Sequence, residues 1–316
     1  MHIRKLVKSG YASLVLAVPK EWVTANKLKA GDMVYLDQDS NKLIICPELK
    51  PAMASDKDEI VINVDNKKYW SVVRELIAAY MDNYNHIILK GKDLPAIAKD
   101  LKKTISDLVA LELVDESSEK IVAKSFLNLY DVDIKLLINR IDNILRSVMI
   151  ETKASLKNKD LVQSIVERDD QVNRLVFLLF KILKAGHKDK KILSVLKLSE
   201  MDVLRYWEVG IHMEKIGDRL KQITKLAVHL EPKKKAKFLA LYEDIEKLYK
   251  DCMKAFYNFS HEMADTVSHA SRNTMPAIID VYIKDENCAL CSQIAVNFYN
   301  INSNINDISR IMRYLR

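Results

Sequence analysis

Hydrophobic and polar positions alternate over short stretches in the first third of the chain and recur at helical spacing over long stretches afterwards. Between Pro95 and Pro232 there is no proline, so no residue in that stretch removes a helical backbone donor. The pattern predicts three parts: a strand-rich domain at residues 1–50, a small α/β connector at 56–126 and an all-α bundle at 127–316.

The first part is predicted to contain two strands, a short helix opened by Pro19, and two further strands. Four short strands and one helical turn bury too little apolar surface to be stable alone, so we expect this domain to complete its core with a second copy of the chain. The strands are predicted at residues 3–8, 13–18, 33–37 and 42–46.

The connector is predicted to follow a β-α-β-α-β-β order, which makes a small α/β layer. It has no glycine-rich phosphate loop and no cluster of acids or nucleophiles, so we expect it to serve as a spacer. Its strands are predicted at residues 59–64, 86–90, 109–114 and 121–125, and its helices at 67–84 and 94–108.

Long helices with short connections predict an antiparallel bundle in the third part. Gly210 and Gly217 lie inside one of these helices, where glycine is unfavourable, so we expect another group to approach the helix closely there. The helices are predicted at residues 131–155, 160–185, 199–230, 236–274 and 278–314, with a break near Pro276.

Composition narrows the functional class. The chain is 49% hydrophobic with a net charge of +7, and its longest apolar stretches fall far short of the ~20 residues of a membrane span. The start has no pattern of a secretory signal, so we expect a cytoplasmic protein without a transmembrane segment. The positive charge is compatible with a polyanionic partner. No nucleophile–base–acid set is evident, which predicts a protein that is not an enzyme.

Two pairs of oxygen-bearing side chains stand out in the bundle. Glu214 and Asp218 lie four residues apart on one predicted helix, as Asp169 and Asn173 do on another, and each pair therefore shares a helix face. If the two faces adjoin, four oxygen ligands converge, as a divalent or ferric cation requires. Spacing alone leaves the alternative of a solvated face with i,i+4 ion pairs.

The first fifty residues contain the order Arg-Lys…Ser-Gly…Val-Pro-Lys-Glu-Trp…Ala-Gly-Asp-Met-Val, which resembles the AbrB/SpoVT swapped-hairpin family. The resemblance implies a homodimeric DNA-binding domain, with Arg4, Lys5, Lys8 and Lys20 facing the duplex. Because a two-fold dimer doubles every basic side chain, phosphate contacts would supply most of the affinity. The alternative is that the domain only dimerises the chain.

The stretches Glu-Arg-Asp-Asp-x-Val at 167–172 and Glu-Lys-Ile-Gly-Asp-Arg at 214–219 resemble the PhoU family of phosphate-uptake regulators, and the three-part order resembles its archaeal-type fusion with an AbrB-like domain. The resemblance implies two three-helix repeats and an iron or zinc site at Asp169, Glu214 and Asp218, with Asn173 where the family has Asp. The second repeat is expected to be degenerate, because Ser303 and Asp307 align with Glu214 and Asp218.

These features predict a homodimeric, DNA-binding regulator of phosphate uptake and phosphate homeostasis, with a metal-binding helical sensor domain. The alternative is an adaptor that does not bind DNA and represses a phosphate ABC transporter or a sensor kinase by protein–protein contact. A metal-dependent hydrolase that uses Glu214 and Asp218 is the least supported reading, since no catalytic set accompanies them.

Overall fold

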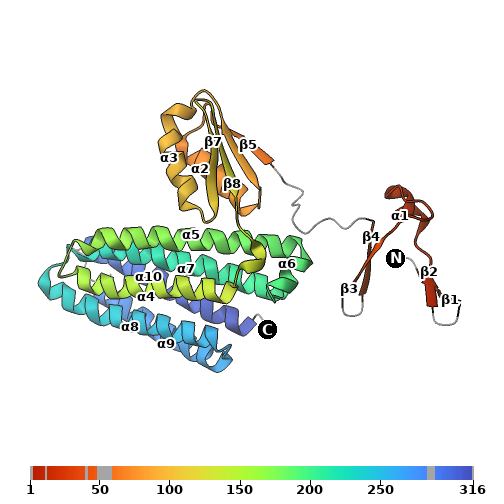
Figure 1. Ribbon diagram of the computed structural model, residues 1–316. Helices are drawn as coiled ribbons and strands as arrows, with labels where there is room; N and C mark the ends of the chain where they lie inside the picture. Colours follow the sequence, from red (N-terminus) through yellow and green to blue (C-terminus); the bar gives the residue numbers. More distant parts are fainter. Residues whose placement is uncertain (1–2, 11–12, 40–41, 48–58, 283–288, 315–316) are drawn as a thin grey trace. The chain divides into compact units, whose positions relative to one another are not determined.

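The computed structural model describes residues 3–10, 13–39, 42–47, 59–282 and 289–314. The chain divides into two compact units, residues 1–54 and 55–316, and each is described by itself. The predicted connector and the predicted bundle therefore belong to one unit. The chain is mostly helical, with small sheets (Figure 1).

The first unit holds two antiparallel hairpins, β1–β2 and β3–β4, with the short helix α1 between them, in the predicted order. Among its described side chains none is buried, and Leu6, Leu14 and Leu36 are each more than 60% exposed. The swapped-hairpin pairing, which needs a second chain, stays a prediction. The elements are β1 (Leu6–Ser9), β2 (Ser13–Leu16), α1 (Lys20–Ala25), β3 (Tyr35–Asp39) and β4 (Lys42–Cys46).

The connector forms a four-stranded sheet in the order β5-β6-β8-β7, with β5 and β6 parallel and the other pairs antiparallel. Ile62, Ile87 and Leu89 alternate with more exposed residues along their strands and join the core made with α2 and α3. The elements are β5 (Glu59–Asn63), α2 (Tyr69–Met81), β6 (His86–Lys90), α3 (Leu94–Asp107), β7 (Leu111–Glu116) and β8 (Lys120–Ser125).

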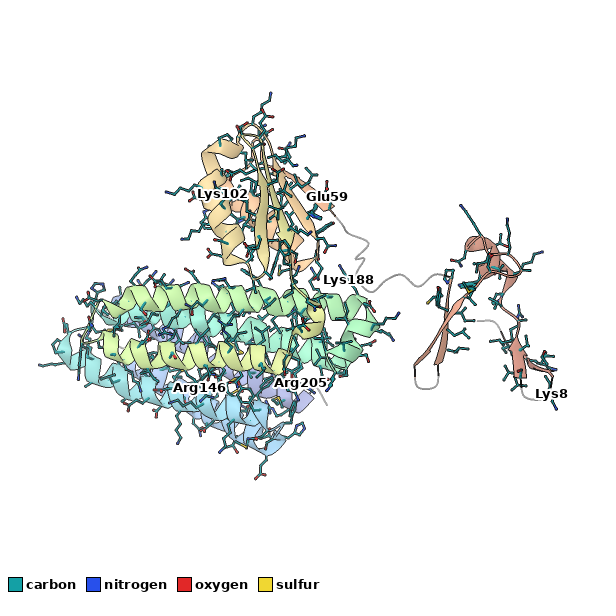
Figure 2. The ribbon with its side chains drawn as sticks, viewed as in Figure 1. Lys8, Glu59, Lys102, Arg146, Lys188 and Arg205 are labelled. Carbon is teal, nitrogen blue, oxygen red and sulfur yellow. The ribbon has the colours of Figure 1, made fainter. Side chains whose placement is uncertain are left out.

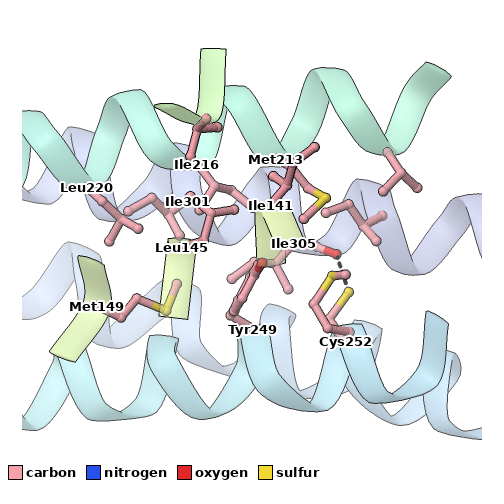
Figure 3. Packing of buried hydrophobic residues seen from close by; sticks show 14 of the residues in the cluster. Ile141, Leu145, Met149, Met213, Ile216, Leu220, Tyr249, Cys252, Ile301 and Ile305 are labelled. Atoms are coloured by element: carbon pink, nitrogen blue, oxygen red, sulfur yellow. Dashed lines mark hydrogen bonds between the residues drawn. The ribbon is translucent and has the colours of Figure 1, made fainter. Parts of the chain in front are cut away.

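The bundle is built from two triplets of helices. Helices α4, α5 and α7 pack on one another, α8, α9 and α10 do the same, and α7 packs along α10 to join the triplets (Figure 1). Figure 3 shows side chains from both triplets in one core, including Leu145, Met213, Tyr249 and Ile305. The helices are α4 (Ile134–Ser155), α5 (Leu161–Lys188), α6 (Lys190–Val195), α7 (Glu200–Ala227), α8 (Pro232–Tyr257), α9 (His261–Tyr282) and α10 (Ala289–Tyr314), after a short 3-10 turn η1 (Leu129–Asp131).

Two predicted helix boundaries were wrong. The single helix expected at 236–274 is two helices, α8 and α9, because the chain turns at 258–260, where Phe259 has a φ of 49°. The break expected near Pro276 does not occur, since Pro276 lies inside α9. Pro276 is exposed, so water can reach the carbonyl group that its missing N–H leaves without a partner.

A buried carboxylate links the two triplets. Asp142 on α4 is 2% exposed. Its Oδ1 accepts hydrogen bonds of 2.9 Å from Arg146 Nε and from the hydroxyl of Tyr249 on α8, and its Oδ2 accepts one of 2.9 Å from the Tyr257 hydroxyl. Both oxygens of a buried charge are thus satisfied, as burial requires.

The connector packs on the bundle through α2 and α5. Lys181 on α5 is 2% exposed, its Nζ donates to the Tyr80 carbonyl at 2.9 Å, and it lies 4.5 Å from the centroid of the Tyr80 ring. Burial lowers the pKa of Lys181 to about 8. Asn83 Nδ2 donates to the Lys181 carbonyl at 2.9 Å, and Lys184 forms an ion pair with Asp82.

Candidate functional site

Two of the four predicted metal ligands, Asp169 on α5 and Asp218 on α7, are joined through Lys221 where α5 packs on α7. Asp169 on α5 is 2% exposed, and Glu214 and Asp218 on α7 lie close enough to influence it electrostatically. We call Asp169, Glu214 and Asp218 the acidic cluster. The fourth predicted ligand, Asn173, lies one turn further along α5 and is partly buried. The condition stated in the sequence analysis, that the two helix faces adjoin, is met for Asp169 and Asp218.

Helix α7 is fixed at its start by a capping box, in which Ser199 Oγ accepts from the Asp202 N–H at 3.1 Å and Asp202 accepts from the Ser199 N–H at 2.9 Å. The close approach predicted at both glycines is confirmed. A Cβ at Gly210 would lie 2.8 Å from Leu179 and 3.1 Å from Phe180. A Cβ at Gly217 would lie 3.3 Å from Leu145 and 3.4 Å from Asp169 Oδ1, so glycine lets α7 approach the acidic cluster.

Lys221 bridges Asp169 and Asp218, and the sequence prediction missed it. Its ammonium forms an ion pair with Asp169 and a second one of 2.8 Å with Asp218 Oδ1. The Lys221 side chain is 18% exposed. The signal was available, because Lys221 follows Asp218 by three residues and so shares its helix face.

Burial acts on two acids of the cluster, Asp169 and Glu214. It raises the pKa of Asp169, against the opposing effect of the hydrogen bond from Lys221. Burial also raises the pKa of Glu214, and the negative charges of Asp218 and Asp169 raise it further. Asp169 Oδ1 and Asn173 Oδ1 are buried and have no hydrogen-bond partner. The site therefore holds more negative charge and more acceptors than Lys221 alone satisfies.

The donor set offers carboxylate and amide oxygens, two of them unpaired, which suit a hard cation better than zinc, whose protein ligands are mostly nitrogen and sulfur. The arrangement of the described residues is a poorer fit, because among them no group of three or more His, Cys, Asp or Glu residues lies close enough together to hold a metal ion. Lys221 is bonded to Asp169 and Asp218, two of the predicted ligands. The predicted metal site stays a prediction, and Lys221 stands against it.

The second triplet carries a reduced version of this cluster. Asp307 on α10, which aligns with Asp218, is bonded to Arg310 three residues later at 3.4 Å. On α9, Ser271 is buried where the first triplet has Asp169, and the buried Ser268 donates to Asn306 at 2.9 Å. Hydroxyl and amide groups cannot supply the charge that a cation needs.

The predicted DNA-contacting residues lie in the first unit and are all exposed. Arg4 and Lys5 precede β1, Lys8 lies on β1, and Lys20 begins α1. Figure 2 shows the Lys8 side chain extending from its hairpin. Exposed positive side chains of this kind are the ones that contact phosphate groups of nucleic acids.

None of the described helices is both long and apolar enough to cross a membrane. No protein-family model matches the chain, and no curated protein matches it. Among solved structures, the chain is similar to PhoU from Pseudomonas aeruginosa, with 14% identity and a TM-score of 0.47 over 58% of this chain and 94% of that chain.

Proposed function

We propose that the chain is a homodimeric regulator of phosphate uptake that binds DNA through residues 1–50 and performs no catalysis. The order of the two motif-bearing regions in the sequence supports this function. The two helical triplets, with their acidic cluster on α5 and α7, agree with the repeats implied by the PhoU resemblance.

The observation that carries the proposal is the absence of a core in the described part of the first unit. Val7, Val15 and Leu36 are all at least half exposed, yet they sit on paired strands of apolar composition. Exposed apolar side chains on paired strands are typical of an interaction surface. A second copy of the same hairpins would cover it and would set two identical basic surfaces side by side.

The dimer is tested by replacing Leu14 and Leu36, 63% exposed each, with aspartate in one variant. Buried charges at a two-fold interface should weaken association by roughly tenfold to hundredfold. Light scattering coupled to size exclusion should give twice the chain's mass for the wild type and a shift toward one chain for the variant. Leu136→Asp, an exposed position on α4, is the control. A wild-type protein that stays a single chain at all concentrations would refute the proposal.

DNA binding is tested with the variant Arg4→Ala/Lys5→Ala/Lys8→Ala. A dimer of this variant loses up to six phosphate contacts, so affinity for an arbitrary duplex at low salt should fall roughly tenfold to hundredfold, and the slope of log K against log salt should fall by up to about 5. Fluorescence anisotropy measures both quantities. Lys20→Ala, which removes one charge from α1, should have a smaller effect of the same kind.

The matched control is Lys233→Ala/Lys234→Ala/Lys235→Ala, which removes the same charge from α8. It should leave DNA affinity nearly unchanged. If instead the N-terminal variant binds DNA with wild-type affinity while its dimer stays intact, the proposal that residues 1–50 bind DNA is wrong. The alternative function, a protein–protein adaptor, then replaces it. If the N-terminal variant does lose DNA affinity, genomic binding sites mapped with phosphate replete and depleted would connect DNA binding to phosphate uptake.

A further inference from the structure

The sheet of the connector has two edges, and one of them is protected against pairing with another strand. Strand β7 forms this edge, and its register with β8 shifts between Leu113 and Asp115. Its exposed acidic residues are Glu112, Asp115 and Glu116. A β-bulge and charged side chains are features by which edge strands avoid pairing with another chain.

Strand β5 forms the opposite edge of the sheet (Figure 1), and among the described strands it pairs with β6 alone. Its register with β6 is unbroken from Glu59 to Asn63, and Glu59 is its one charged residue. Val61, in the middle of the strand, is 55% exposed. A regular, β-branched edge of this kind is the type to which a further strand adds.

The backbone groups of β5 alternate between the two sides of the strand. Just beyond its end, the Val64 N–H donates to the Lys90 carbonyl of β6 at 3.0 Å. Because the bonding direction reverses at each residue of a strand, every second residue of β5 also faces β6. The N–H and C=O groups of the residues between them point away from β6 and can bond a further strand: Glu59, Val61 and Asn63.

These three residues are complementary to a second copy of themselves. If two β5 strands pair antiparallel about a two-fold axis at Val61, each Val61 faces the other and each Glu59 faces an Asn63. Asn63 Oδ1 accepts from the Asp65 N–H at 2.8 Å, which leaves the Asn63 amide N–H groups as donors to the Glu59 carboxylate. Lys90, beside Asn63 in the sheet, is exposed and adds a positive charge at the same end.

We propose that β5 is a self-association edge, at which two copies of the chain join their four-stranded sheets into one continuous sheet. The pairing supplies about six backbone hydrogen bonds, two in each facing pair of residues. A strand this short makes a weak contact alone, and the contact strengthens when another interface already holds the two chains together. The inference goes beyond the proposed function, because this surface lies outside residues 1–50.

The test is disulfide trapping of the full-length variant Val61→Cys. At the two-fold axis the two Cα atoms at position 61 lie about 5.5 Å apart, which a disulfide can span. With oxidised glutathione as oxidant, this variant should form a cross-linked dimer that non-reducing gel electrophoresis detects and a reductant dissolves. Val114→Cys, 47% exposed on the protected edge, is the matched control. It should cross-link no more than the wild type with its native cysteines.

A second variant tests the edge without a disulfide. In the Leu14→Asp/Leu36→Asp protein, Val61→Lys sets two ammonium groups opposite each other and should weaken the remaining self-association by at least about tenfold. Val114→Lys is the control and should leave it unchanged. Sedimentation velocity over a range of protein concentrations measures both. Because Val61 is largely exposed, neither replacement should disturb the fold, which circular dichroism checks.

The outcomes separate this inference from the proposed function. A folded Val61→Cys that cross-links no more than Val114→Cys overturns the self-association edge and leaves the dimer of residues 1–50 standing. A Val61→Lys that associates as strongly as Val114→Lys also overturns the edge. If Leu14→Asp/Leu36→Asp keeps the mass of the wild-type dimer while Val61→Cys cross-links, the edge is supported and the proposed interface within residues 1–50 fails instead.

Discussion

Replacing Asp142 with alanine is expected to lower the free energy of unfolding by about 3–5 kcal/mol. The side chain is 2% exposed and accepts from Arg146, Tyr249 and Tyr257. Without it, the fully buried Tyr249 hydroxyl loses its acceptor and Arg146 loses its counter-charge. Chemical denaturation followed by circular dichroism measures the change.

The control for this variant is Asp251→Ala, an exposed aspartate on α8, which should change stability by less than about 0.5 kcal/mol. A double-mutant cycle with Tyr249→Phe should show a combined cost below the sum of the single costs, because the unpaired hydroxyl is gone in the double variant. Equal effects of Asp142→Ala and Asp251→Ala would show that the link between α4 and α8 contributes little.

Lys181→Met is expected to raise the free energy of unfolding by about 2 kcal/mol at pH 7. The lowering of the Lys181 pKa from 10.5 to about 8 corresponds to a penalty of about 3 kcal/mol for burying the charge. Methionine keeps the apolar contacts and gives up the contact of the charge with the Tyr80 ring. The Tyr80 carbonyl keeps a donor, since the Asn83 N–H lies 3.1 Å from it.

The pH dependence follows from the direction of this pKa change. Because the folded pKa lies below the unfolded one, the penalty is fully present below pH 8, decreases as pH rises toward 10.5, and vanishes above it. The stability difference between Lys181→Met and wild type should therefore shrink across that range. Lys188→Met, at the exposed end of α5 (Figure 2), should show no such trend. A difference independent of pH would contradict the assignment.

Much of the fold could be predicted from the sequence because the local signals agree with the packing. The order of strands and helices in the connector matches, and the capped start of α7 at Ser199 lies where the sequence places it. The turn at Phe259 was missed because the apolar spacing continues through it and no glycine or proline marks it, although Ser260, whose Oγ accepts from the Met263 N–H, is a typical helix-cap residue. Conversely, Pro276 is a strong local signal for the end of a helix. Helix α9 nevertheless continues through it, because the position is exposed to water.

The sequence analysis identified the acidic residues of the candidate site but not its cation, Lys221. Spacing identifies residues that share a helix face, and it paired Glu214 with Asp218 on one helix and Asp169 with Asn173 on another. Which helix faces meet is decided by tertiary packing, so the contact of Lys221 with Asp169 was beyond local reasoning. Asp142 and Lys181 left a weaker trace, as single charged residues within otherwise apolar helical stripes.

Helix α5 carries both Asp169 and Lys181, about 18 Å apart along its axis. Asp169 is bonded to α7, and Lys181 to the last turn of α2. A rotation of α5 about its own axis would turn both side chains away from their partners at once. The orientation of this helix is therefore set jointly by α7 and by the α/β layer. A rotation that lengthens one of these contacts would also lengthen the other.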